Sequence, residues 1–390
     1  MHTTRETNDA SHQVRCVAAT SPGQWLYLLG DEGVVYSESQ NRFVGLDAAG
    51  ISAYRAFEAG ARVEDLSGFS TSRNPPSDPD NGLEAIYALS KGLFPAGDPS
   101  QEWPPLDRPI PANIEIDGIP IALDSPAGPL EDLCRDYFRN CPPSTQPARS
   151  HLWAVPTTNG WTIQVNGREF LGSLRPQQLG LGLLHAARSL LYAQGNYDVA
   201  FHAATVADGE CGIMLCAPRE FGKSTLAAYL MAQGFDLLTD EPALLHLDTC
   251  TVSPLHLPVS LKEGSWSVLQ QECPQLAGAP IHIRSDGTRI SLLHPPQESL
   301  LVPSRRLSCI LFPHYSPSSA AGAEALLPLR TLHLLNEGGM LLAKHIKRDT
   351  FEVFLNFIYR TPAFMIQYAS LKDAYALILN LLQSRVKTPS

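Results

Sequence analysis

The residues whose types and spacing could do chemistry cluster around one glycine-lysine-serine run. An apolar segment, residues 211–216, leads into a loop that ends in Gly222, Lys223 and Ser224, and a helix-like stretch follows. In this strand–loop–helix setting, backbone N–H groups and the start of the helix attract phosphate. The residues expected to hold the phosphates of a nucleotide are Ala217, Pro218, Arg219, Glu220, Phe221, Gly222, Lys223, Ser224 and Thr225.

Within this loop, Lys223 would reach the outer phosphates and the Ser224 hydroxyl would coordinate magnesium. Two positions depart from the usual pattern. Ala217 replaces the first glycine, and Glu220 stands where another glycine is common. Alanine is tolerated if its φ is ordinary, whereas Glu220 must point away from the phosphates. The alternative interpretation is a Gly-Lys-Ser turn that opens an ordinary helix.

Two adjacent acids, Asp240 and Glu241, follow the next predicted strand at 235–239. Because parallel α/β sheets carry their chemistry at the carboxyl ends of strands, both acids are expected near the terminal phosphate. One can hold magnesium and the other can take a proton from an attacking hydroxyl. An exposed acidic turn is the alternative.

A histidine, His202, closes the strand-like segment before the loop. In an apolar setting, a single histidine is usually a hydrogen-bonded core residue. On the residues alone, that interpretation is favoured over a role in catalysis.

The elements expected to position these residues alternate between strands and helices. Leucines and alanines at helical spacing predict a helix over 177–194, and from residue 211 the strand, turn, helix, strand order is typical of an α/β domain. Asp47 is placed to cap a helix over 47–57. Strands are predicted at 25–29, 33–36, 42–46 and 161–165, and further helices near Val63, at 82–89 and at 130–140.

Composition favours a globular protein with more than one domain. The 390 residues are 44% hydrophobic and 17% charged, which argues against global disorder. A formal charge of −10 and the lack of a long Lys/Arg run argue against a nucleic-acid partner. The polar start, the lack of a long apolar stretch and eight scattered cysteines without a C-x-x-C pair predict a cytoplasmic protein with no membrane partner.

Shifts in composition divide the chain into five segments. Proline density marks the main boundary, and the segment before the phosphate loop alternates like short strands. A homo-oligomer is compatible with the sequence. The expected organisation is a flexible N-terminus (1–23), a small N-terminal domain (24–92), a Pro-rich linker (93–111), a strand-rich lobe (112–175) and an α/β P-loop domain (176–386).

The second half of the chain resembles the catalytic domain of HPr kinase/phosphorylase and its relatives in peptide-modification gene neighbourhoods. The resemblance rests on the run from His202 to Ala204, the phosphate loop and the run 237–241, and it covers about 113–382. It implies a kinase that uses ATP and Mg²⁺. Asp240 would be the general base and Glu241 a metal-side carboxylate, where the family has a second aspartate.

The same resemblance gives roles to three further positions. It places His202 beside the phosphates, which makes a catalytic role for this histidine as plausible as a core one. It also suggests Arg305 or Arg306 as a phosphate-steadying arginine and Lys262 as a further candidate.

Residues 24–92 resemble a PqqD-type peptide-recognition element, a small winged-helix-like unit. Its pattern is carried by 33–36, 42–47 and 61–66. The resemblance implies that this domain binds the leader of a precursor peptide as an added edge strand. A small α/β cap with a structural role is the alternative.

The sequence therefore predicts transfer of the ATP γ-phosphoryl group to a Ser or Thr hydroxyl of a ribosomally made peptide or a protein. Lys223, Asp240 and His202 are the expected catalytic residues, and Ser224, Asp240 and Glu241 the expected metal ligands. Three alternatives stay open: a small-molecule kinase, an ATP-dependent peptide-activating enzyme, and a nucleotide-sensing module without catalysis.

Overall fold

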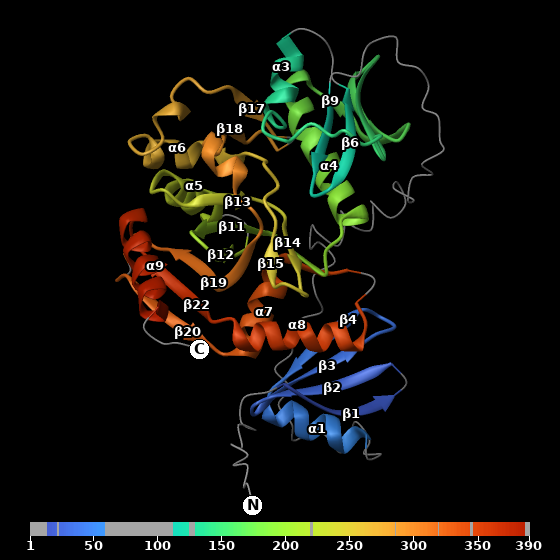
Figure 1. The fold of residues 1–390 in the computed structure, drawn as a ribbon, viewed down its shortest axis with the longest axis vertical. Helices are drawn as coiled ribbons and strands as arrows, with labels where there is room; N and C mark the ends of the chain where they lie inside the picture. The colour runs from blue at the N-terminus through green and yellow to red at the C-terminus, as the bar shows by residue number, and fades with distance from the viewer. Residues whose placement is uncertain are drawn as a thin grey trace, which may run out of the picture.

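The computed structural model describes residues 14–21, 23–58, 112–124, 129–218, 221–284, 286–318, 320–343 and 346–386. These residues form a mixed α/β protein with several sheets (Figure 1). The helices expected near Val63 and over 82–89, the Pro-rich linker 93–111, and Arg219 and Glu220 lie outside the described residues.

The N-terminal part is a four-stranded antiparallel sheet with one helix. Tight turns join neighbouring strands, and Asp47 accepts a hydrogen bond from the Gly50 N–H at 2.7 Å, as expected of a helix cap. The predicted strands and helix are confirmed, whereas the first strand lies in the segment expected to be a flexible N-terminus. The elements are β1 (Arg15–Ser21), β2 (Gln24–Leu29), β3 (Glu32–Ser37), β4 (Arg42–Leu46) and α1 (Ala48–Glu58).

This small sheet packs against helix α8 (Arg348–Arg360) of the C-terminal part (Figure 1). The Tyr36 ring stacks on Phe351 with their centroids 4.0 Å apart. The Asn41 amide donates to the backbone oxygen of Leu342 at 3.2 Å. Aromatic packing and backbone hydrogen bonds therefore join the N-terminal sheet to the rest of the protein.

The strand-rich lobe is a five-stranded sheet in the order β5-β6-β7-β8-β9, with α4 packed against it. The strand predicted at 161–165 and the helix predicted over 177–194 are both confirmed. The elements are β5 (Ala112–Ile116), β6 (Ile119–Asp124), α3 (Pro129–Asp136), β7 (Ser150–Thr157), β8 (Gly160–Val165), β9 (Arg168–Leu174), the 3-10 turn η2 (Pro176–Gln178) and α4 (Leu179–Gln194).

A ten-stranded sheet forms the centre of the molecule, with main strand order β13-β11-β12-β19-β15-β14-β10-β21. Strand β22 pairs with β19 and β20. The strands are β10 (Val199–Phe201), β11 (Ala203–Asp208), β12 (Cys211–Cys216), β13 (Asp236–Thr239), β14 (Ala243–His246), β15 (Thr251–Val252), β19 (Arg305–Tyr315), β20 (Gly322–Leu326), β21 (Met340–Leu342) and β22 (Ala363–Tyr368).

Helices cover both faces of this sheet, and two hydrophobic clusters fill the spaces between them. A small sheet, β16-β18-β17, lies beside α5 and α6. The remaining elements are α5 (Lys223–Ala232), β16 (Val259–Lys262), α6 (Glu263–Leu269), η3 (Pro274–Leu276), β17 (Ile281–Ile283), β18 (Arg289–Leu293), η4 (Gln297–Leu301), α7 (Pro328–Gly339) and α9 (Leu371–Val386).

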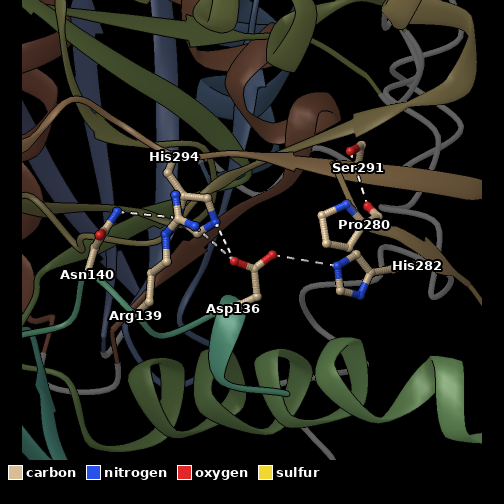
Figure 2. Close-up of polar contacts among 7 residues, drawn as sticks. All are labelled: Asp136, Arg139, Asn140, Pro280, His282, Ser291 and His294. Atoms are coloured by element: carbon tan, nitrogen blue, oxygen red, sulfur yellow. Dashed lines mark hydrogen bonds and ion pairs between the residues drawn. The ribbon is translucent and has the colours of Figure 1, made fainter. Parts of the chain in front are cut away.

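A polar cluster joins the strand-rich lobe to the small sheet (Figure 2). Asp136, at the end of α3, lies 3.1 Å from Nε2 of His294 and 3.9 Å from Nε2 of His282. Asn140 Nδ2 approaches His294 Nδ1 at 3.3 Å. Burial would raise the pKa of Asp136, but both histidines, together with Arg139, hold it well below its usual range.

None of the helices in these described ranges is long and apolar enough to cross a bilayer.

Candidate active site

Four parallel strands of the central sheet end at the same edge. Strand β12 runs parallel to β19, which runs parallel to β22, and β13 has the same direction because both β12 and β13 are antiparallel to β11. The phosphate loop leaves β12 after Cys216, and the acid pair follows β13 after Thr239. His202 lies at this edge too, because Ala203 next to it pairs with Cys216. The fold therefore brings the predicted loop, acids and histidine together.

The usual pattern has a glycine at the positions of Ala217 and Gly222. In this structure, only the position of Gly222 requires one. Gly222 has a φ of 84°, a left-handed conformation that favours glycine, and it caps α5. Ala217 is not among the described residues with positive φ and is 2% exposed. Alanine therefore replaces glycine at this position without backbone strain.

Lys223 points back into the loop. It is 8% exposed, and its Nζ donates to the Ala217 oxygen at 2.5 Å and to the Pro218 oxygen at 3.3 Å. Phosphate oxygens are acceptors of the same kind but carry charge, so they would replace these carbonyls as partners of the ammonium group. The lysine is thus held where a bound phosphate would need it.

The remaining loop residues have different surroundings. The Ser224 hydroxyl lies beside Asp240, whereas the Thr225 hydroxyl is 2.6 Å from that of Ser265. Phe221 is 40% exposed and meets His314 edge to face. The Thr225 side chain is therefore turned toward α6, and Ser224 is the hydroxyl placed next to the acid.

Asp240 is a buried carboxylate only partly supplied with hydrogen bonds. It is 6% exposed; Oδ2 accepts from the Ser260 N–H at 3.1 Å, and Oδ1 is buried without a hydrogen-bond partner in the described part of the chain. Burial raises the pKa of Asp240, while the Ser224 hydroxyl, Arg188 and the Ser260 N–H oppose the rise. A buried acid that lies beside the loop serine and has one unpartnered oxygen is what a cation ligand would present.

Glu241, one residue further, points to other partners. Its Oε1 is 2.7 Å from His202 Nδ1, and its Oε2 is 3.4 Å from Arg188 Nη1. Burial would raise the pKa of Glu241, but the charges of Arg188 and His202 hold it well below its usual range. Glu241 therefore stays ionised, and it fixes the orientation of the His202 ring.

This arrangement differs from the expected one in two respects. Glu241, expected at the metal, is bound to Arg188 and His202, while Asp240 is the acid next to Ser224. Sequence reasoning also missed Arg188. The sequence did contain a signal: Arg188 is a lone arginine on the apolar face of the helix predicted over 177–194. An arginine buried at such a place is stable only when it is paired with an acidic side chain.

The arginines suggested from the resemblance lie elsewhere. Arg306 pairs with Cys211, at the start of β12, and Arg305 forms an ion pair with Glu210 at 3.3 Å. Cys211 and Cys216 are the two ends of β12, roughly 17 Å apart. Both arginines are therefore at the opposite edge of the sheet from the phosphate loop. Lys262 lies two residues beyond Ser260 on β16 and close to Asp286.

The residues present fit a magnesium ion that is held largely by phosphate. Mg²⁺ typically takes one or two protein oxygens plus phosphate and water. Asp240 Oδ1 and the Ser224 hydroxyl provide such a pair. Among the described residues, no group of three or more His, Cys, Asp or Glu side chains is arranged to hold a metal by itself.

No protein-family model matches this chain, and no curated protein matches it closely in sequence.

Proposed function

We propose that the protein is an ATP-dependent phosphotransferase that moves the γ-phosphoryl group to a Ser or Thr hydroxyl of a peptide or protein. One observation carries the proposal: Lys223, Asp240 and the His202–Glu241 pair lie at one edge of the sheet, where β12 ends and α5 begins. The motif resemblance to HPr kinase supports the same reaction.

The phosphates would be held by Lys223 and by the N–H groups at the start of α5, which neutralise the charge that develops on transfer. Asp240 and Ser224 would hold Mg²⁺, which would supply positive charge to stabilise the phosphates during transfer. Because Asp240 already faces Ser224, we assign it to the metal and not to proton transfer.

Proton removal from the acceptor is assigned to His202. Glu241 accepts the hydrogen bond from Nδ1–H, which leaves Nε2 as the basic nitrogen. The acceptor hydroxyl passes its proton to Nε2 as its oxygen attacks the γ-phosphorus, and ADP leaves with the bridging oxygen. Arg188 holds Glu241 in place from the opposite side, so it acts as a positioning residue.

A peptide acceptor is favoured by the N-terminal sheet. Strand β4 pairs only with β3 among the described strands, and its Val44 is 54% exposed. An open edge strand can accept an extended peptide through backbone hydrogen bonds. Residues 24–92 would thus bind the leader of a ribosomally made precursor.

The direct test is intact mass spectrometry of the precursor peptide encoded beside the gene after incubation with the protein and Mg-ATP. A gain of about 80 Da on a Ser or Thr is the expected product of phosphoryl transfer. Phosphorylation of a small metabolite alone would remove the peptide assignment. A transient phosphorylated carboxyl or amide would indicate peptide activation, and ATP binding without any turnover would indicate a sensor.

The proton assignment is tested with His202→Gln. We expect transfer to slow by about a hundredfold while ATP affinity changes little, because the base acts only in the transition state. His333→Gln is the matched control, since His333 also pairs with a glutamate, Glu337, at 3.0 Å on the surface of α7. Equal rates in both variants would refute the role of His202.

A further inference from the structure

Three aromatic side chains lie in the phosphate loop or at the end of β19, the strand next to β12 on the side away from β13. Phe221 lies in the loop itself, and His314 and Tyr315 end strand β19. Phe221 is 40% exposed and Tyr315 is 53% exposed, which is unusual for side chains of this size. These three residues are called the aromatic rim.

The order of the strands sets the direction in which a nucleotide would lie. The loop follows β12; β11 and β13 lie on one side of it, and β19 and β22 on the other. His202 and Asp240 belong to the β11–β13 side. If a nucleotide with its terminal phosphate at these residues extends along the edge of the sheet, its base lies across the ends of β19 and β22, at the aromatic rim.

The geometry of the rim suits a flat ring. Phe221 and His314 meet edge to face at 87° with centroids 5.7 Å apart, so the Phe221 ring does not stack on its neighbour. The Tyr315 ring is 6.0 Å from that of Tyr368. A Cβ placed on Gly222 would lie 3.7 Å from the Tyr368 hydroxyl, which puts the loop directly beside β22.

The strand ends that carry the rim are held together. The Ser316 N–H donates to the Tyr368 oxygen at 2.9 Å, immediately after β19 ends. Tyr368 itself is 1% exposed and packs in the core beneath. The rings of the rim are therefore exposed, while the strand ends beneath them are held in place by hydrogen bonding and core packing.

We propose that the base of the bound nucleoside triphosphate stacks on the aromatic rim, with Phe221 and Tyr315 as its main contacts. This inference rests on the proposed function, because it takes the nucleotide phosphates to occupy the loop. Every nucleobase has a π-face, so stacking on aromatic side chains is a general means of binding it.

The test compares two probes by calorimetry on the full chain: Mg-ATP, which carries a base, and Mg-tripolyphosphate, which does not. We expect Phe221→Ala and Tyr315→Ala each to weaken ATP binding about tenfold, the size typical of losing one stacking contact. Tripolyphosphate affinity should stay within about twofold in Tyr315→Ala, because Tyr315 ends strand β19 and lies outside the phosphate loop. Leu301→Ala, which truncates a still more exposed apolar side chain just before the far end of β19, should alter neither affinity.

Equal affinity of the wild-type protein for both probes would overturn the rim assignment and leave the phosphate site intact. The same holds if Tyr315→Ala weakens binding of both probes equally, or weakens only binding of the peptide substrate. Failure of both probes to bind the wild-type protein would overturn the proposed function and the rim assignment together. Circular dichroism spectra of the variants establish that each is folded.

Discussion

Asp240 and Glu241 are neighbours in sequence, but their surroundings affect their carboxyl groups in opposite directions. Burial dominates at Asp240 and raises its pKa, whereas Arg188 and His202 lower the pKa of Glu241. A pair of acids whose environments move their pKa values apart is typical of a site where each has its own task. We therefore treat Asp240 as the metal ligand and Glu241 as the residue that orients His202.

Replacing Asp240 by Asn should raise the stability of the protein and lower its phosphoryl-transfer activity. The raised pKa means that the ionised carboxylate costs stability in the folded state; this cost is absent below pH 3.8 and complete above the raised value. At pH 7, Asp240→Asn should therefore raise the melting temperature by about 2 °C. Transfer should fall by at least about a hundredfold, since a charged ligand of the magnesium ion is lost.

Thermal melts at pH 7 and a phosphoryl-transfer assay over a magnesium titration measure both effects. A variant that melts well below the wild type would show that Asp240 is structural. A variant with normal turnover at low magnesium would refute its role as a metal ligand.

The sequence predicted Asp240, Glu241, His202 and Lys223 as site residues because each stands at a fixed place relative to a strand or helix. It assigned Asp240 to proton transfer and Glu241 to the metal without any sign of where each carboxyl group points. Their directions depend on Arg188, which is about 50 positions away in sequence and meets Glu241 only in the folded protein. Such a long-range ion pair leaves no local pattern.

At the scale of elements, strong periodicity made the structure predictable. The predicted strand at 211–216, the helix after it and the helix over 177–194 correspond to β12, α5 and α4. The two-residue β15 and the three-residue β17 were not predicted, because strands of this length are defined by their partners and not by their own residues.

The contact of α3 with the small sheet gives a prediction with a definite pH dependence. The pKa of Asp136 is held below its ordinary 3.8, so its favourable contribution is present above pH 3.8 and is lost as pH falls toward the lowered value. Asp136→Asn should destabilise the protein by about 2 kcal/mol at pH 7, because two buried histidines lose a charged partner.

Denaturant unfolding at several pH values measures this difference, which should shrink below pH 3.8. Asp132→Asn is the control, because Asp132 lies on the same helix but is exposed. If both variants lose the same stability, or if the Asp136 effect does not change with pH, the cluster in Figure 2 does not stabilise this contact electrostatically.

At the scale of the whole molecule, the N-terminal sheet is part of the packed structure. Gly45 of β4 lies so close to Leu329 of α7 that a Cβ there would be 2.6 Å from Leu329 Cδ1, and Tyr36 stacks on Phe351. The other end of α7 approaches the loop, since a Cβ on Gly338 would be 2.7 Å from Cys216 Sγ. Helix α7 thus spans the distance between the N-terminal sheet and the end of β12.

The sequence predicted this N-terminal unit as a separate domain because a proline-rich stretch follows it. Its packing against α7 and α8 was not predictable, since tyrosines on a strand look the same whether they pack within their own domain or against another. Removing the unit would expose Phe351, so a test of peptide recognition requires point variants on β4 and not a truncated chain.

The central claim is that the loop between β12 and α5 holds the phosphates of ATP. Calorimetric titration of Mg-ATP into the wild-type protein and into Lys223→Ala tests it most directly. We predict saturable binding by the wild type and at least about a hundredfold loss in the variant, which lacks the buried ammonium group. Equal affinity in the two proteins, or no binding by the wild type, would contradict the account.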